Sequence, residues 1–159
     1  MKNKKAQQAV EASFSTIFSI FLIIAFIAFA FVAIKFFLGF KTSSQIGQFY
    51  TDLQKQVDTA KSSTTSSAEF EINLPEKLDY VCFLNTTEMQ NNPDIEIDSF
   101  DRDSNVYLLP EKETKNLGSN MITSLNIAEM TKEQNPYCVS TTEVLIITKE
   151  AFSKLVVIK

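Results

Sequence analysis

The sequence contains no histidine and no tryptophan, and it has only three glycines among its 159 residues. Histidine is the commonest general base and the commonest metal ligand in proteins, so its absence excludes trypsin-like and papain-like catalysis and histidine-zinc sites. The glycines, Gly39, Gly47 and Gly118, lie too far apart to form a phosphate-binding loop. We therefore predict a protein that is not an enzyme and that has no catalytic residues, cofactor or metal site.

Positive charge is also scarce, above all in the larger part of the chain. From Thr42 onward there are 18 Asp and Glu against 10 Lys and Arg, a net charge of −8. A nucleic-acid partner requires a basic surface that can replace the counterions of the phosphates. The sequence thus predicts no nucleic acid among the partners.

A long apolar run extends from Phe14 to Phe40, and between Ile17 and Ile34 its only polar side chain is Ser19. As a helix this run would extend roughly 40 Å at about 1.5 Å per residue. It would therefore cross a hydrocarbon core of roughly 30 Å. The apolar region of a cleaved secretory signal is shorter, about 7 to 15 residues. We predict a transmembrane helix over residues 14–40.

Lysines on the two sides of this run indicate its orientation. Lys2, Lys4 and Lys5 precede it within a basic segment, residues 1–13, whereas Lys35 and Lys41 lie at its far end. Because positive residues near a span are retained inside, we expect a single-pass protein of the cell membrane with a cytoplasmic N-terminus. The C-terminal domain would then lie outside.

Residues 41–61 have a helical period but a narrow apolar stripe, which predicts an amphipathic extension of the first helix. The stripe consists of Ile46, Phe49, Leu53, Val57 and Ala60. It would be buried either against the chain's own head or against a neighbour's helix. Six Ser and Thr residues at 62–67 end the pattern and predict a short linker.

From Ala68 onward apolar residues alternate with polar ones, which indicates β-strands in a head domain of residues 68–159. We also expect a hairpin at Asp101–Asn105 between Ile95–Ile97 and Val106–Leu109. The other predicted strands are 68–74, 78–84, 121–127, 137–140, 144–148 and 155–158. The fold class is α+β: a long N-terminal transmembrane helix followed by a small antiparallel β-sandwich-like head.

The two cysteines, Cys82 and Cys138, both lie in the part expected outside the membrane. An even number of cysteines in an oxidising compartment predicts one disulfide. In the chain-entropy model such a long loop contributes roughly 4 kcal/mol. The alternative is two unpaired buried cysteines in adjacent strands.

Two further motifs lie in the head. Asn85-Thr86-Thr87 is an acceptor sequon that makes Asn85 a candidate glycosylation site in an exported domain. Asp101-x-Asp103-x-Asn105 begins like a calcium loop, which then requires a glycine and a glutamate at its sixth and twelfth positions. Val106 and Lys112 occupy those positions, so the match fails.

The N-terminal segment Lys4-Lys5-Ala6-Gln7-Gln8-Ala9-Val10-Glu11 resembles the class III signal peptide of archaeal type IV pilin-like proteins. The resemblance implies cleavage after Ala6 by a prepilin peptidase-like enzyme, with Gln7 as the first mature residue and Glu11 as the fifth. A carboxylate inside an apolar layer is costly unless it is paired or protonated. The new N-terminal amine of another subunit would neutralise Glu11.

Two functions follow from these patterns. The first is a pilin-like structural subunit of a surface filament, processed at its N-terminus and assembled as a homo-oligomer through its hydrophobic helix. The alternative is an uncleaved single-pass anchor that presents a small extracellular binding or accessory domain, in which Glu11 is a solvated residue before the anchor.

Overall fold

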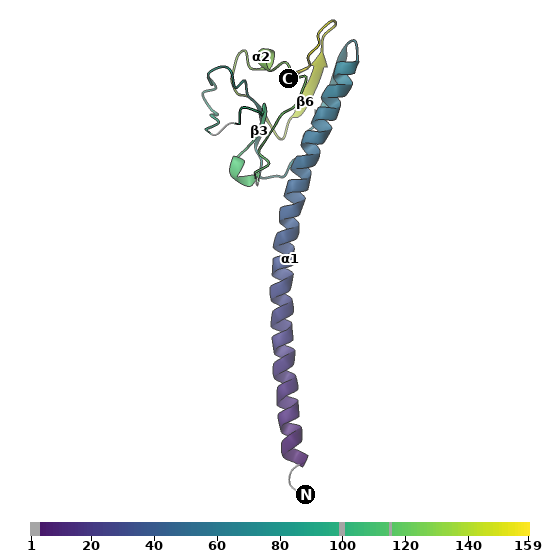
Figure 1. Cartoon of the computed structure of the whole chain (residues 1–159), viewed down its shortest axis with the longest axis vertical. Coiled ribbons are helices and arrows are strands. Elements are labelled where there is room, and N and C mark those ends of the chain that lie inside the picture. Colours follow the sequence, from purple (N-terminus) through teal and green to yellow (C-terminus); the bar gives the residue numbers. More distant parts are fainter. Residues whose placement is uncertain (1–3, 99–100, 115) are drawn as a thin grey trace. The chain divides into compact units, whose positions relative to one another are not determined.

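The computed structural model describes the backbone of residues 4–98, 101–114 and 116–159, and the side chains within these ranges from Ser15 onward. The chain divides into two compact units, residues 1–41 and residues 42–159. One long helix, α1 (Lys4–Ser62), supplies most of the first unit and the beginning of the second. Figure 1 shows this helix and the strands that follow it.

Helix α1 ends in a cluster of hydroxyl side chains. Ser62 and Ser63 both donate hydrogen bonds from Oγ to the carbonyl oxygen of Thr59, at 2.8 and 3.2 Å. The ammonium group of Lys149 donates to the carbonyl oxygen of Ser63. The last carbonyls of a helix have no partner within it, so these donors stabilise the end of the helix and fix where it ends.

The part of α1 within the second unit buries one face. Ile46, Leu53 and Val57 are completely buried, while the residues between them on the other face are exposed. The buried face packs into the core of the head rather than remaining available to a neighbour. The sequence left open whether this stripe packs against the chain's own head or against a neighbour's helix, and the structure shows that it packs against the head.

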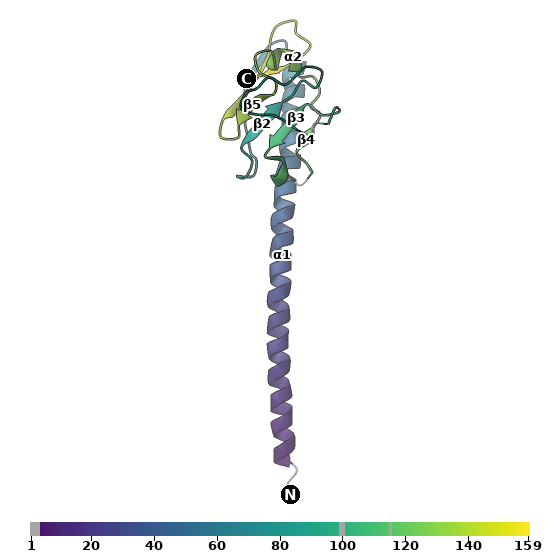
Figure 2. The same ribbon diagram turned by 90° about the vertical axis from the view of Figure 1, so that its left-hand side faces the viewer.

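The head contains two antiparallel sheets. The first has the order β1-β6-β7 and the second the order β4-β3-β2-β5, and Figure 2 shows the four strands of the second sheet. The strands are β1 (Ser66–Glu71), β2 (Tyr80–Phe83), β3 (Val106–Leu109), β4 (Ser119–Asn120), β5 (Tyr137–Ser140), β6 (Val144–Lys149) and β7 (Val157–Ile158). Two short helices complete it, η1 (Glu111–Glu113) and α2 (Ile127–Met130).

Apolar side chains from the helix and from both sheets form one core. Leu145 and Ile147 of β6 contribute from the first sheet, and Val81 and Leu108 contribute from the second. Phe49 of α1 packs against Phe70 of β1 with ring centroids 5.9 Å apart. The predicted α+β class, a long apolar helix followed by a small β head, is confirmed.

The expected hairpin between Ile95–Ile97 and Val106–Leu109 is wrong. Strand β3 pairs with β2 and β4, and residues 95–97 form no strand. The backbone N–H and carbonyl of Ile97 both bond to the side-chain amide of Gln90, at 2.9 Å each. Ile97 is buried against the outer face of the second sheet. The alternation of apolar and polar residues at 95–97 therefore reflects burial and not strand pairing.

The expected strand over residues 121–127 is also wrong. The structure has the two-residue strand β4 just before it, a single bridge from Leu125 to Val156, and helix α2 from Ile127. The backbone N–H and carbonyl of Ile122 both bond to the side-chain amide of Asn105, at 2.8 Å each. The predicted linker is shorter than expected, because β1 already begins at Ser66.

Truncating the buried stripe should weaken the whole head. We expect Leu53→Ala to lower the free energy of unfolding by about 2 to 5 kcal/mol, because it leaves a cavity between the helix and both sheets. Chemical unfolding of the full-length protein in detergent measures this change. The exposed neighbour Gln56 provides the control, since Gln56→Ala should change stability by less than about 0.5 kcal/mol. Equal effects of the two variants would contradict the packing.

Candidate functional site

The most extensive exposed apolar surface of the described residues lies on the first part of α1. Every residue from Ser15 to Leu38 is exposed, including Phe26, Phe29 and Phe36 at 70% or more. Ser19 donates its hydroxyl to the carbonyl oxygen of Ser15 at 2.8 Å, so its polar group is satisfied within the helix. This helix is long and apolar enough to cross a membrane.

The predicted processing and assembly residues Ala6, Gln7 and Glu11 all belong to the first turns of helix α1. Their side chains lie outside the part of the chain whose side chains the structure describes. Cleavage after Ala6 and pairing of Glu11 therefore stay predictions.

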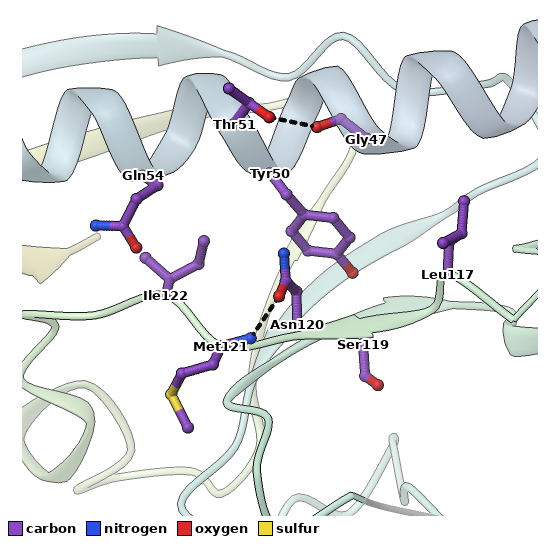
Figure 3. Close-up of a pocket in the computed structure, with 9 residues that line it drawn as sticks. All are labelled: Gly47, Tyr50, Thr51, Gln54, Leu117, Ser119, Asn120, Met121 and Ile122. Carbon is purple, nitrogen blue, oxygen red and sulfur yellow. Dashed lines mark hydrogen bonds between the residues drawn. The ribbon is translucent and has the colours of Figure 1, made fainter.

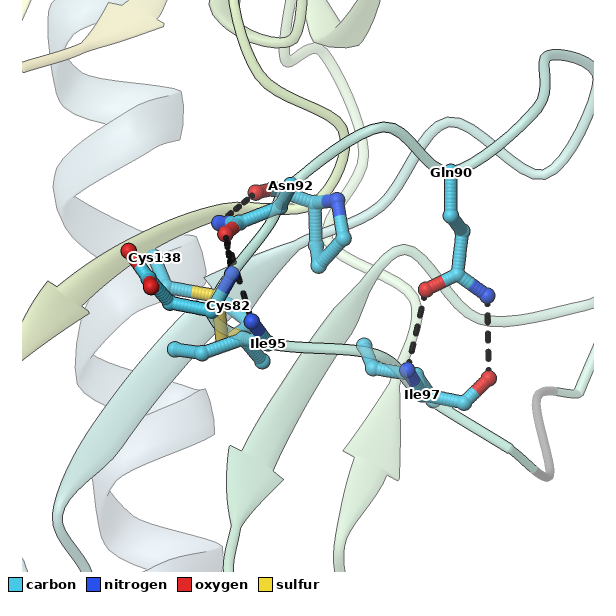
Figure 4. The surroundings of a disulfide bond; sticks show 8 residues. Cys82, Gln90, Asn92, Ile95, Ile97 and Cys138 are labelled. Atoms are coloured by element: carbon cyan, nitrogen blue, oxygen red, sulfur yellow. Dashed lines mark hydrogen bonds between the residues drawn. A yellow bond between two sulfur atoms is a disulfide. The ribbon is translucent and has the colours of Figure 1, made fainter.

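The two cysteines form a disulfide bond, as predicted, and the alternative of unpaired cysteines is wrong. Cys82 in β2 lies directly opposite Cys138 in β5, with their Cα atoms 4.0 Å apart. Figure 4 shows the bond beneath the segment that carries Ile95 and Ile97. Cys82 is fully buried there together with Leu84, Ile97 and Tyr107. The disulfide thus joins two adjacent strands beneath a covering loop.

The candidate glycan acceptor Asn85 is buried at the end of β2. Its side-chain oxygen accepts hydrogen bonds from the backbone N–H and the hydroxyl of Thr87, at 3.2 and 2.7 Å. Its backbone N–H and carbonyl bond to the side-chain amide of Asn135, each at 3.0 Å. This burial disfavours attachment of a glycan to the folded head, and modification of Asn85 before folding stays a prediction.

The acidic segment at residues 101–105 has a structural role. Asp101 accepts a hydrogen bond from the backbone N–H of Asp103 at 3.0 Å, and its carbonyl accepts the hydroxyl of Tyr107 at 2.6 Å. Burial, and next the negative charge of Asp101, raise the pKa of Tyr107 to about 12. Within the described ranges, no group of three or more acidic or cysteine side chains is placed to hold a metal ion.

A groove of about 520 Å³ lies between helix α1 and the edge strand β4, as Figure 3 shows. Tyr50 projects from the helix into its wall and is 6% exposed. The Tyr50 hydroxyl has no hydrogen-bond partner among the residues that the structure describes. The residues lining the groove are Gly47, Tyr50, Thr51, Gln54, Leu117, Ser119, Asn120, Met121 and Ile122. Sequence reasoning missed this groove because its two walls are distant in the chain.

The groove contains no charged side chain among its lining residues, and burial raises the pKa of Tyr50, so its hydroxyl stays protonated. No protein-family model matches the chain, and no curated protein and no solved structure is significantly similar to it.

Loss of the disulfide should destabilise the head. We expect the double variant Cys82→Ala, Cys138→Ala to unfold with a free energy about 2 to 4 kcal/mol lower, because the bond restricts the unfolded chain between residues 56 positions apart. Denaturant unfolding of the full-length protein with and without reductant measures this. Reductant should move the wild type toward the double variant and leave the variant unchanged. A double variant as stable as the wild type would contradict a stabilising role.

The head should also lose stability at high pH. The pKa of Tyr107 is raised to about 12 in the folded state, against about 10 in the unfolded state. Between these values the unfolded state loses its proton first, so the stabilisation is complete below pH 10 and falls as the pH rises toward 12. Tyr107→Phe should make this decline shallower in unfolding curves at pH 8 to 12. Parallel declines for both proteins would contradict this assignment.

Proposed function

We propose that this protein is a pilin-like subunit of a surface filament. The single observation that supports it best is that one helix, α1, carries both a fully exposed apolar surface and the buried stripe of the head. A subunit of this kind inserts in a membrane as a precursor and exchanges lipid for the helices of other copies when it assembles. The acidic head remains in water.

The N-terminal residues provide the second support. The order of two lysines, Ala6, Gln7 and Glu11 matches the cleavage site that the signal-peptide resemblance implies. A peptidase that cuts after Ala6 removes residues 1–6, which include Lys2, Lys4 and Lys5, and leaves a free amine at Gln7. Glu11 then lies one helical turn from that amine, at the edge of the apolar surface. A carboxylate in this place needs a positive partner, which an adjacent copy would supply.

The mature N-terminus tests the proposal. We expect intact-mass spectrometry of the protein from native membranes and surface fractions to give a chain that begins at Gln7, with the mass of one disulfide. A chain that begins at Met1 or Lys2 would contradict processing. It would instead favour the single-pass anchor that presents a small extracellular binding domain.

The role of Glu11 is tested by Glu11→Ala. Because this variant lacks the carboxylate that pairs with the amine, it should be absent from sheared surface filaments and still be found in the membrane, by immunoblot of both fractions. Glu88→Ala removes an exposed carboxylate of the head and should leave both fractions unchanged. Filament yields equal to wild type in the Glu11 variant would exclude this pairing.

A further inference from the structure

A fully exposed phenylalanine lies at the tip of the loop between β6 and β7. Phe152 is 100% exposed and has a φ of 69°, in the left-handed region that bulky residues rarely adopt. The backbone N–H of Ser153 donates to the carbonyl of Glu150 at 3.2 Å, so Phe152 occupies the third position of a tight turn. Glycine or asparagine is usual where this position has a positive φ. Two unfavourable features at one residue suggest a role outside the folding of the head.

The loop tip is held in place by its neighbours. The Ser153 hydroxyl donates to the carbonyl of Leu155 at 2.8 Å and accepts from the N–H of the same residue at 3.2 Å. Leu155 itself is followed by the buried Val156. The aromatic ring is therefore presented by an ordered turn, which lowers the entropy lost when it binds a partner.

The groove lined by Tyr50, called the Tyr50 groove below, is a recess, whereas the loop tip projects from the head. Leu117 and Met121, 40% and 44% exposed, form its apolar flank, and Gly47 leaves open space on the helix side. Figure 3 shows the Tyr50 ring between Asn120 and Leu117 with its hydroxyl directed away from the helix. The Tyr50 hydroxyl itself is buried, so the apolar flank forms the surface that an incoming side chain would contact.

Charge also favours this pairing. The lining residues of the groove and the tip residues 151–153 are all uncharged. The flanks of the tip carry Lys149 and Lys154 against Glu150, a net charge of +1, whereas residues 42–159 carry −8. Two such heads repel each other over most of their surfaces. Because its tip is neutral and its flanks carry +1, the loop of one copy can approach the acidic head of a second copy without repulsion.

Within one copy the two features lie at different ends of the head. Lys149, which precedes the loop, pairs with Ser66 and bonds to Ser63 at the end of α1. Gly47 lies roughly 24 Å earlier along the helix at about 1.5 Å per residue. Figure 1 likewise shows the loop after β6 beside the end of α1. A contact between them must join different copies, and a contact of this head-to-tail type propagates into a ring or a filament.

We propose that Phe152 of one copy inserts into the Tyr50 groove of a second copy, where its ring packs against the exposed side chains of Leu117 and Met121. This inference deepens the proposed function and rests on it, because it assigns a contact between heads in addition to the helix. The occupant is a second copy of this chain, through a neutral loop with one aromatic side chain.

Photo-crosslinking tests the contact directly. With p-benzoylphenylalanine in place of Phe152 in the full chain, we expect irradiated filaments and membranes to give dimers. Their cross-linked peptides should join the loop to residues 47–54 or 117–122 of the second copy. Cross-links to another region, to lipid or to a different protein would overturn the proposal, and so would their absence. If cross-linked dimers form in membranes without filaments, the contact stands and the filament function fails.

Variants separate the contact from folding. Phe152→Gly should reduce self-association about tenfold or more, as loss of a central aromatic anchor does, without lowering the melting temperature, since glycine accepts the positive φ. Met121→Lys in the groove should have a similar effect on self-association. Met89→Ser, at a methionine that is 92% exposed, is the matched control and should have no effect. A Phe152→Gly protein that associates like the wild type would overturn the proposal.

Discussion

Burial of the apolar stripe of helix α1 in the head is the interaction on which the rest of the structure depends. Ile46, Leu53 and Val57 lie completely inside a core to which both sheets contribute. Each sheet is small, with three or four short strands, and such sheets bury too little apolar surface alone. The helix gives both sheets a common surface to pack on. The chain therefore uses one helix for two purposes, an exposed apolar surface before residue 41 and a scaffold after it.

Side-chain amides complete the parts of the head that the sheets do not reach. Gln90, Asn105 and Asn135 each bond to both the N–H and the carbonyl of one backbone residue. An amide group has the donor and acceptor of a strand partner, so it satisfies a buried backbone without a second strand. Loops can then cover the outer face of the second sheet and the disulfide. The head keeps a compact core with few residues in strands.

The proposed assembly would use the surfaces of the chain that its own folding leaves exposed. The apolar segment of α1 needs lipid or other apolar helices around it, because every residue from Ser15 to Leu38 is exposed. Because residues 42–159 carry a net charge of −8, the proposed contact between heads would use neutral or basic patches. The Phe152 loop and the Tyr50 groove are two such patches.

The sequence by itself determined the elements whose signals are local. The apolar run of α1, its buried stripe and strands β2, β3, β5 and β6 were predictable, because a period of 3.6 or 2 reports burial along a continuous segment. Residues 95–97 and 121–127 alternate in the same way, yet they bond to Gln90 and Asn105 instead of to strands. Only the tertiary structure decided those partners, the alignment of Cys82 with Cys138, and the groove at Tyr50, because each joins residues distant in the chain.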